Sequence, residues 1–225
     1  DNDVYEAARA FTGWTIDLDE ASPTRGQFRY DHSDHDRFNK FFLCQYLPPD
    51  TDNMHDGNAV LDTLASHPGT ARHICWKLCR RFISDDPPDS IVSSAAQVFL
   101  EHKDADDQIA LVLRHIIESD EFAAAPAQKF RRPLEWLISM MRALGVPFRN
   151  DSEWTFIWKF RAMGHETFAW PSPDGPPEEA EAWATSHGFV QRWNFMTPMA
   201  SHWYDDDGFS FEVASWLPPE AESAQ

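Results

Sequence analysis

Apolar positions recur at helical spacing over most of the chain. The clearest example is residues 67–82, where Pro68 and Thr70 mark a helix start. The apolar residues that follow share one face of that helix: Ala71, Ile74, Cys75, Leu78 and Phe82. The sequence Asp85-Asp86-Pro87-Pro88 then ends the segment sharply. We therefore expect a core helix over residues 67–82, with the other helices packed around it.

The same periodicity predicts a first helix that ends at Gly13, with Val4, Ala8 and Phe11 on one face. Further helices are expected over residues 58–66, 89–102, 105–118, 133–144, 154–164, 178–186 and 189–199. Strict alternation is confined to residues 14–18 and 27–30, which predicts a small hairpin. Prolines make residues 168–177 extended and turn-rich, because each proline fixes φ. The expected fold class is mainly α: one irregular helical domain over residues 1–200 with a small N-terminal β-hairpin, followed by an acidic irregular tail over residues 201–225.

The charge balance narrows the class of partner. The chain has 37 acidic against 19 basic residues and a net charge of −18, whereas a nucleic-acid phosphate backbone needs a basic footprint. No apolar run approaches the roughly 20 residues of a membrane helix, so membrane insertion is not expected. Three cysteines cannot form a disulfide framework. Cys75 and Cys79, one helical turn apart, are expected to be buried small hydrophobes, with a metal-binding pair as the alternative.

Residues 30–40 are polar and rich in His and Asp. His32, His35 and Asp36 supply imidazole and carboxylate groups within five residues, and such groups bind zinc and other divalent transition metals. Neighbours in one loop rarely provide three ligands of fixed geometry, so a remote histidine would have to join them. The structural alternative is that His35 and Asp36 anchor the loop by hydrogen bonds while His32 faces water.

The polar faces of residues 67–82 carry the densest positive patch in the chain: Arg72, Lys77, Arg80 and Arg81. These cations can bind a phosphate, sulfate or carboxylate. They can equally pair with Asp85, Asp86 and Glu135 and so lock helices together, and the acidic excess favours ion pairing.

Ten Trp and 17 Phe residues indicate an aromatic-rich core or aromatic rings on a binding surface. Trp154 and Trp158 lie at helical spacing and are expected in the core. Trp170, near Asp174, and Trp203, near Asp205, pair an aromatic face with a carboxylate, which suits stacking on sugar rings or other flat ligands.

Several segments, taken in order, resemble the C-terminal half of the bacterial family catalogued as domain of unknown function 1800. They are Asp3–Trp14, His35-Asp36 with Lys40, His67-Pro68 with Thr70-Ala71, Lys77–Phe82 running into Asp85–Pro88, Ser119–Phe122, Arg132–Glu135 and Pro171–Gly175. The resemblance implies a mostly helical protein, often exported, whose relatives carry a further helical half upstream. The chain begins without Met, as a processed or truncated product would. A missing N-terminal half or a second chain is therefore an expected partner.

This chain departs from the family pattern at two places. The family pattern usually has a glycine between His-Asp and Lys, where this chain has Arg37-Phe38-Asn39. It has Leu-Gly after the following Phe, where this chain has Leu43-Cys44. The family implies no activity, and it implies an extracytoplasmic location (periplasmic or secreted), with a cytoplasmic location left open.

Two functional hypotheses follow. The first is an extracytoplasmic binding or assembly module that holds a glycan or a protein partner on the aromatic and Pro-rich surface after Gly164. The second is a metal-dependent enzyme in which His32, His35 and Asp36 bind the metal and Arg80 or Arg81 orients an anionic substrate. The sequence has no nucleophile-elbow, P-loop or dinucleotide-binding motif, so it gives no positive support for serine hydrolase, nucleotide hydrolase or NAD chemistry.

Overall fold

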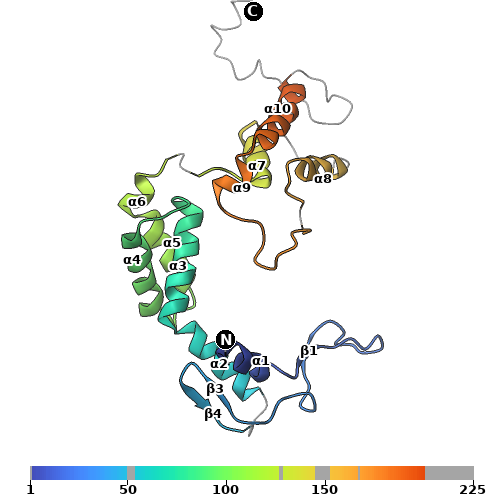
Figure 1. Cartoon of the computed structure of the whole chain (residues 1–225), viewed down its shortest axis with the longest axis vertical. Helices are drawn as coiled ribbons and strands as arrows, with labels where there is room; N and C mark the ends of the chain where they lie inside the picture. Colours follow the sequence, from blue (N-terminus) through green and yellow to red (C-terminus); the bar gives the residue numbers. More distant parts are fainter. Residues whose placement is uncertain (1, 50–53, 127–128, 145–152, 167, 201–225) are drawn as a thin grey trace, which may run out of the picture. The chain divides into compact units, whose positions relative to one another are not determined.

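The computed structural model describes residues 2–49, 54–126, 129–144, 153–166 and 168–200 (Figure 1). The chain divides into two compact units, residues 1–77 with 89–116, and residues 78–88 with 117–225. The expectation of a single domain over residues 1–200 stays a prediction. Helices dominate, and the strands form two small antiparallel pairs near the N-terminus. The predicted mainly α fold with a small N-terminal β-hairpin is confirmed.

The first unit begins with α1 (Asn2–Ala10), followed by the predicted hairpin of β1 (Trp14–Ile16) and β2 (Phe28–Tyr30). Helix α1 packs against β3 (Lys40–Phe42) and α2 (His55–Ala65). The face expected to be buried is wrong for α1, because Val4 is 75% exposed while Glu6 and Ala10 point inward. Glu6 is tolerated there because its carboxylate accepts hydrogen bonds from Arg9 and from the Phe41 amide. The core beside α1 consists of Ala10, Phe42, Leu47 and Val60.

A second hairpin, of β3 and β4 (Gln45–Leu47), was not predicted. Its register places Phe41 opposite Tyr46. The turn residues Leu43 and Cys44 have φ of 44° and 63°, and such a two-residue turn normally uses Asn-Gly. Cys44 occupies the position where the family pattern has glycine, so in this chain a residue with a side chain adopts the left-handed backbone conformation. Residues 37–39 have no positive φ, and the backbone there does not require glycine.

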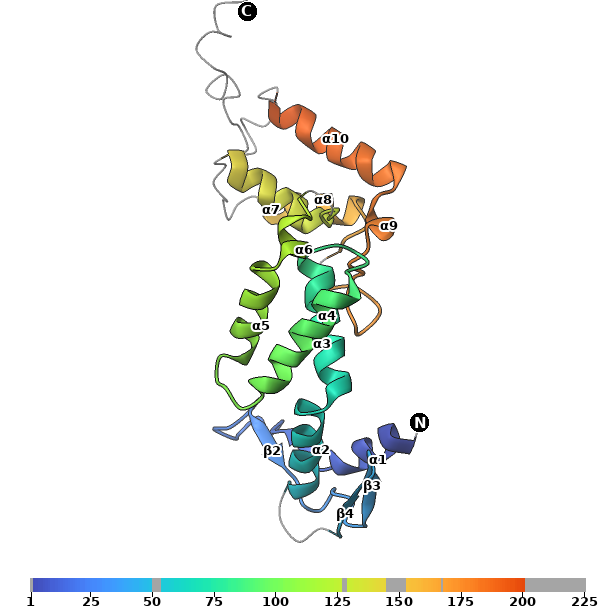
Figure 2. The same cartoon turned by 90° about the vertical axis from the view of Figure 1, so that its left-hand side faces the viewer.

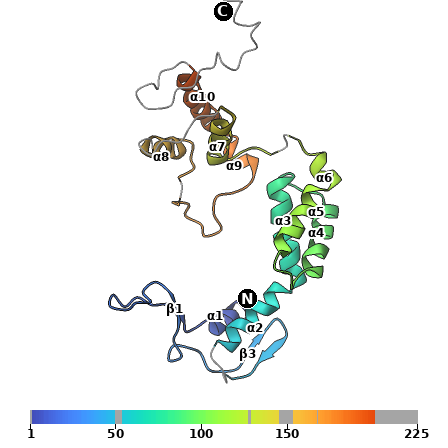
Figure 3. The ribbon, with the colours of Figure 1, turned by 180° about the vertical axis from the view of Figure 1, so that it is seen from behind.

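Three helices complete the first unit. Helix α3 (Pro68–Phe82) contributes its first ten residues, and Figures 2 and 3 show it beside α4 (Asp89–Glu101) and α5 (Gln108–Ile117). The expected helix over residues 67–82 is confirmed. The buried apolar residues of these helices within the unit are Ala71, Cys75, Ile91, Val92, Ala95, Phe99, Val112 and Ile116.

The second unit contains α6 (Asp120–Ala123), α7 (Pro133–Leu144), α8 (Glu153–Ala162), α9 (Ala180–Trp183) and α10 (Ser186–Ala200). Its core comes from α7, α8, the turn after α8, and α10, and consists of Leu137, Met141, Phe160, Met163 and Phe195. The segment between α8 and α9 has no helix or strand in its described residues, as its prolines predicted. Trp158 is 59% exposed, so its assignment to the core was wrong, and the Trp154 side chain lies outside the described residues.

The described helices include none with the length and apolar character needed to cross a bilayer. The acidic tail over residues 201–225 and Trp203 within it lie outside the described residues.

Candidate functional site

The His/Asp loop of the first unit closes over a fully buried ion pair. Lys40, the first residue of β3, donates from Nζ to Asp56 Oδ2 at 2.6 Å, and neither side chain has exposed surface. The same Nζ donates to the carbonyl oxygens of Asp36 and Phe38 at 2.5 and 3.0 Å. The ammonium group therefore has three acceptors, as a buried charge requires. Asp56 Oδ1, in contrast, has no hydrogen-bond partner among the described residues.

His35 lies beside this pair and is itself buried. Its Nδ1 is 2.8 Å from the Thr12 carbonyl oxygen, and its Nε2 is 3.6 Å from Asp56 Oδ2. The Thr12 oxygen can only accept, so Nδ1 carries the proton that joins them. The Asp36 amide donates to Thr12 Oγ1 at 2.8 Å, which ties the loop to the segment after α1.

The Asp36 carboxylate faces a different partner. Arg9 donates from Nε and Nη2 to its two oxygens at 2.8 and 3.1 Å, a bidentate pair. The hydrogen bond from Arg9 lowers the pKa of Asp36 to about 2. Asp36 is therefore ionised at any physiological pH, and its pairing with Arg9 binds the loop to α1.

The predicted metal ligands are thus engaged with separate partners. His35 is bonded to Thr12 and Asp36 to Arg9, while His32 is exposed with its ring 6.3 Å from that of Tyr30. Within the described part of the chain, no three His, Cys, Asp or Glu side chains are grouped as a metal site. A divalent metal at His32, His35 and Asp36 stays a prediction, which metal analysis of wild type and a His35→Ala variant would test.

The second unit holds the cations at the end of α3 in a network of carboxylates. Arg81 lies 2.6 Å from Glu135 and 3.0 Å from Glu178, and Arg132 contacts the same two carboxylates. Burial opposes the ionisation of Glu135, but hydrogen bonds from Arg132 and Arg81 outweigh it and lower the Glu135 pKa. This network joins α3, α7 and the segment before α9.

Two further pairs fix the same segment. Arg80 pairs with Glu179, and Lys129 pairs with Asp85, whose second oxygen accepts from the Ala180 amide at 2.6 Å. The remaining predicted cations belong to the first unit, where Arg72 pairs with Asp89 and Lys77 is exposed. Glu135 was among the expected partners, whereas Glu178 and Glu179 were not.

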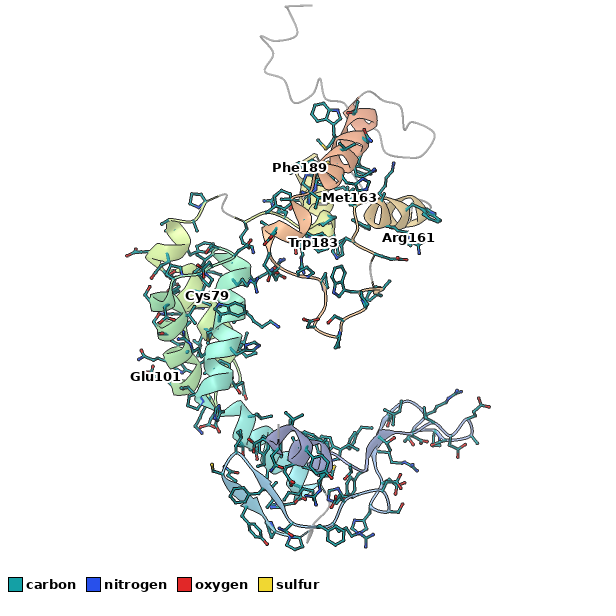
Figure 4. All side chains as sticks on the ribbon, in the orientation of Figure 1. Cys79, Glu101, Arg161, Met163, Trp183 and Phe189 are labelled. Atoms are coloured by element: carbon teal, nitrogen blue, oxygen red, sulfur yellow. The ribbon has the colours of Figure 1, made fainter. Side chains whose placement is uncertain are left out.

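A pocket of about 370 Å³ lies between the start of α7 and the Pro-rich segment. Its lining residues are Arg132, Leu134, His165, Glu166, Phe168, Trp170, Ser172, Pro173, Gly175 and Pro176. Trp170 is half-buried, and its ring lies 6.0 Å from that of Trp183, the α9 residue labelled in Figure 4. The Trp183 indole donates to the Pro177 carbonyl at 2.8 Å. Trp170 therefore lies beside a ring that is itself fixed by a hydrogen bond to the backbone.

Two residues of this pocket were not singled out from the sequence. The side chain of Phe168 is fully exposed, and its backbone has φ of 63°, a conformation that residues other than glycine rarely adopt. His165 is buried, with its ring 5.1 Å from that of Trp183. Burial, and then the charge of Arg132, lower the pKa of His165, so a neutral imidazole is favoured there. The pocket thus combines two aromatic faces with a neutral imidazole and nearby charged groups.

Comparison with protein families matches residues 1–224 to the family described as a protein of unknown function, DUF1800. The chain belongs to the DUF1800 family. No curated protein and no solved structure matches it. The description of DUF1800 names no activity.

Proposed function

We propose that this DUF1800 chain is a binding module that holds a carbohydrate chain in the pocket around Trp170. The observation that carries the proposal is the fully exposed ring of Phe168 on left-handed backbone. That conformation costs about 1–2 kcal/mol for a residue with a side chain. An exposed ring returns none of this cost by packing, whereas contact with a ligand would.

The two rings of the pocket suit a pyranose. An aromatic face carries a partial negative charge, and the C–H groups on one side of a sugar ring are weakly positive. Trp170 is held by Trp183, so little side-chain entropy remains to be lost when a ligand binds. This arrangement supports stacking on a pre-organised platform.

Polar groups at the same pocket can bind hydroxyl groups. Glu166 is 2.8 Å from Arg161, and Ser172 is paired with Asp174, so both are oriented before a ligand arrives. The Leu134 amide donates to His165 Nδ1 at 3.5 Å, so the neutral imidazole carries its proton on Nε2 and offers that N–H as a donor. A mostly apolar wall with a few oriented polar groups is the usual composition of a small-molecule site.

Isothermal titration calorimetry with cellohexaose, chitohexaose and maltohexaose tests the proposal. We expect at least one of them to bind with a Kd of roughly 10 µM to 1 mM, which corresponds to about 4–7 kcal/mol. Trp170→Ala should weaken that binding at least tenfold. Trp193→Ala is the matched control, since Trp193 is 73% exposed on α10 and does not line the pocket. Failure of all three sugars to bind, or an equal loss in the control, would overturn the proposal.

A Phe168→Gly variant separates binding from folding. Glycine adopts positive φ freely, so this variant should be as stable as the wild type or more stable. Its affinity for the hexasaccharide should nevertheless fall, because the ring is lost. A variant that loses stability instead would show that Phe168 serves the fold.

A further inference from the structure

A second cavity in the same unit, also of about 370 Å³, runs along one side of α7 and shares no lining residue with the pocket around Trp170. Its lining consists of Arg81, Phe82, Lys129, Phe130, Arg131, Glu135, Ile138, Ser139 and Arg142. We propose that this basic cavity binds a small organic anion, in which a carboxylate or phosphate group is carried on an apolar body about the size of one ring.

The charges around the basic cavity are unbalanced. Of its four cations, Arg81 is neutralised by Glu135 and Glu178, and Lys129 by Asp85. Arg131 and Arg142 have no ion pair with any carboxylate among the described residues. In a chain with 37 acidic and 19 basic residues, two lining arginines that have no carboxylate partner in the described part of the chain make this cavity a positively charged site. Arginine binds carboxylate and phosphate groups through paired N–H donors.

The positions of the arginines set where the anion lies. Ile138, Ser139 and Arg142 follow Glu135 by three, four and seven residues and so share one face of α7 with it. Glu135 is already held by Arg132 and Arg81, so it does not compete for Arg142, two turns further along. Arg142 and the Ser139 hydroxyl are therefore positioned to bind one anionic group.

The apolar part of the cavity requires an apolar part of the ligand. Phe82 and Ile138 are 39% and 40% exposed, which leaves both for a ligand to cover. Phe130 is fixed by the Arg192 guanidinium 4.5 Å above its ring and by Phe189 at 5.6 Å. An adjoining cavity of about 430 Å³ shares Phe82, Lys129 and Arg131 and continues towards Phe122. Inorganic phosphate would leave this surface exposed, whereas a ring-bearing anion would cover it.

Calorimetric titration of the full chain at low salt tests the inference with four probes. Phenyl phosphate and phenylacetate carry the two anionic groups on one ring, benzyl alcohol carries the ring alone, and inorganic phosphate carries the charge alone. We expect at least one organic anion to bind tenfold or more tightly than both benzyl alcohol and inorganic phosphate. Which of the two organic anions binds more tightly identifies the natural anionic group as phosphate or carboxylate.

Variants then locate the binding. Arg142→Ala, at an exposed position, should lower the affinity for the preferred organic anion at least tenfold, and Arg142→Lys should lower it less. Arg37→Ala is the matched control, because Arg37 is an exposed arginine of the first unit. Equal weak binding of all four probes would overturn the inference. If Arg37→Ala lowered the affinity as much as Arg142→Ala, the inference would also be overturned, since binding would then follow the overall charge of the chain.

Discussion

Lys40→Met should be among the most destabilising single substitutions in the first unit. The substitution removes an ammonium group that lies 2.6 Å from Asp56 Oδ2 with no exposed surface on either side chain. It leaves a buried carboxylate whose other oxygen already has no hydrogen-bond partner among the described residues. Removing one partner of a buried pair costs about 3–5 kcal/mol. The hydrogen bonds to the Asp36 and Phe38 carbonyls add about 1 kcal/mol each, so we expect a total loss of about 5–7 kcal/mol.

A double-mutant cycle tests whether the loss comes from the unpaired charge. Asp56→Asn should cost about 3 kcal/mol, and the double variant should cost at least 2 kcal/mol less than the sum of the two single variants. Because the chain has two units, the assay should report on the first unit by itself, and hydrogen exchange of the peptide covering β3 and β4 does so. Lys77→Met, at an exposed lysine, is the control and should cost less than about 0.5 kcal/mol. A Lys40→Met loss below about 1 kcal/mol, or strictly additive single variants, would refute the reasoning.

Three further predictions concern charge, turn geometry and thiols. The folded-state pKa of Asp36 is lowered to about 2, so the ionised carboxylate stabilises the folded protein above pH ~4, and this stabilisation is lost as the pH falls towards 2. When the free energy of unfolding is measured against pH, the Arg9→Gln variant should lose about 1–2 kcal/mol of this pH dependence. Cys44→Gly should raise the free energy of urea unfolding by about 0.5–1 kcal/mol, because glycine relieves the left-handed φ of 63°, and a loss of stability would contradict this. At pH 8 the exposed thiol of Cys44 should react with Ellman's reagent in the native protein, whereas the buried thiols of Cys75 and Cys79 should react only after unfolding. Burial, together with the charge of Glu121, also raises the pKa of Cys79 to about 11. Fast reaction of all three thiols in the native protein would refute this prediction.

Helices that carry a regular apolar face could be predicted from the sequence. The helix over residues 68–82 follows from its periodicity and from the prolines at its ends. The β3–β4 hairpin could not be predicted, because Leu43-Cys44 lacks the turn residues that normally mark such a hairpin. The inward face of α1 was misjudged for a related reason. Local pattern favoured Val4, but Glu6 is stabilised inside by hydrogen bonds from Arg9 on the same helix and from the Phe41 amide, 35 residues away.

The candidate sites depend on contacts that are remote in the sequence. The loop containing His35 was recognised as a place for chemistry, but Lys40 was not expected to be fully buried, because lysine is almost always exposed unless it is paired. Arg81 meets Glu178 across 97 residues, a partner that no local spacing indicates. Trp170 was identified from its Pro-rich surroundings, whereas Phe168 was missed, because its positive φ is visible only in the folded backbone.

The most direct test of the proposed function is fluorine NMR of protein labelled with 5-fluorotryptophan. A Trp170→Phe variant assigns the Trp170 resonance, and a Trp193→Phe variant assigns a reference resonance outside the pocket. On addition of the hexasaccharide that binds in calorimetry, the Trp170 resonance should shift in a saturable manner while the Trp193 resonance stays in place. A bound sugar that leaves the Trp170 resonance unmoved would contradict the assignment of the pocket around Trp170 as the binding site.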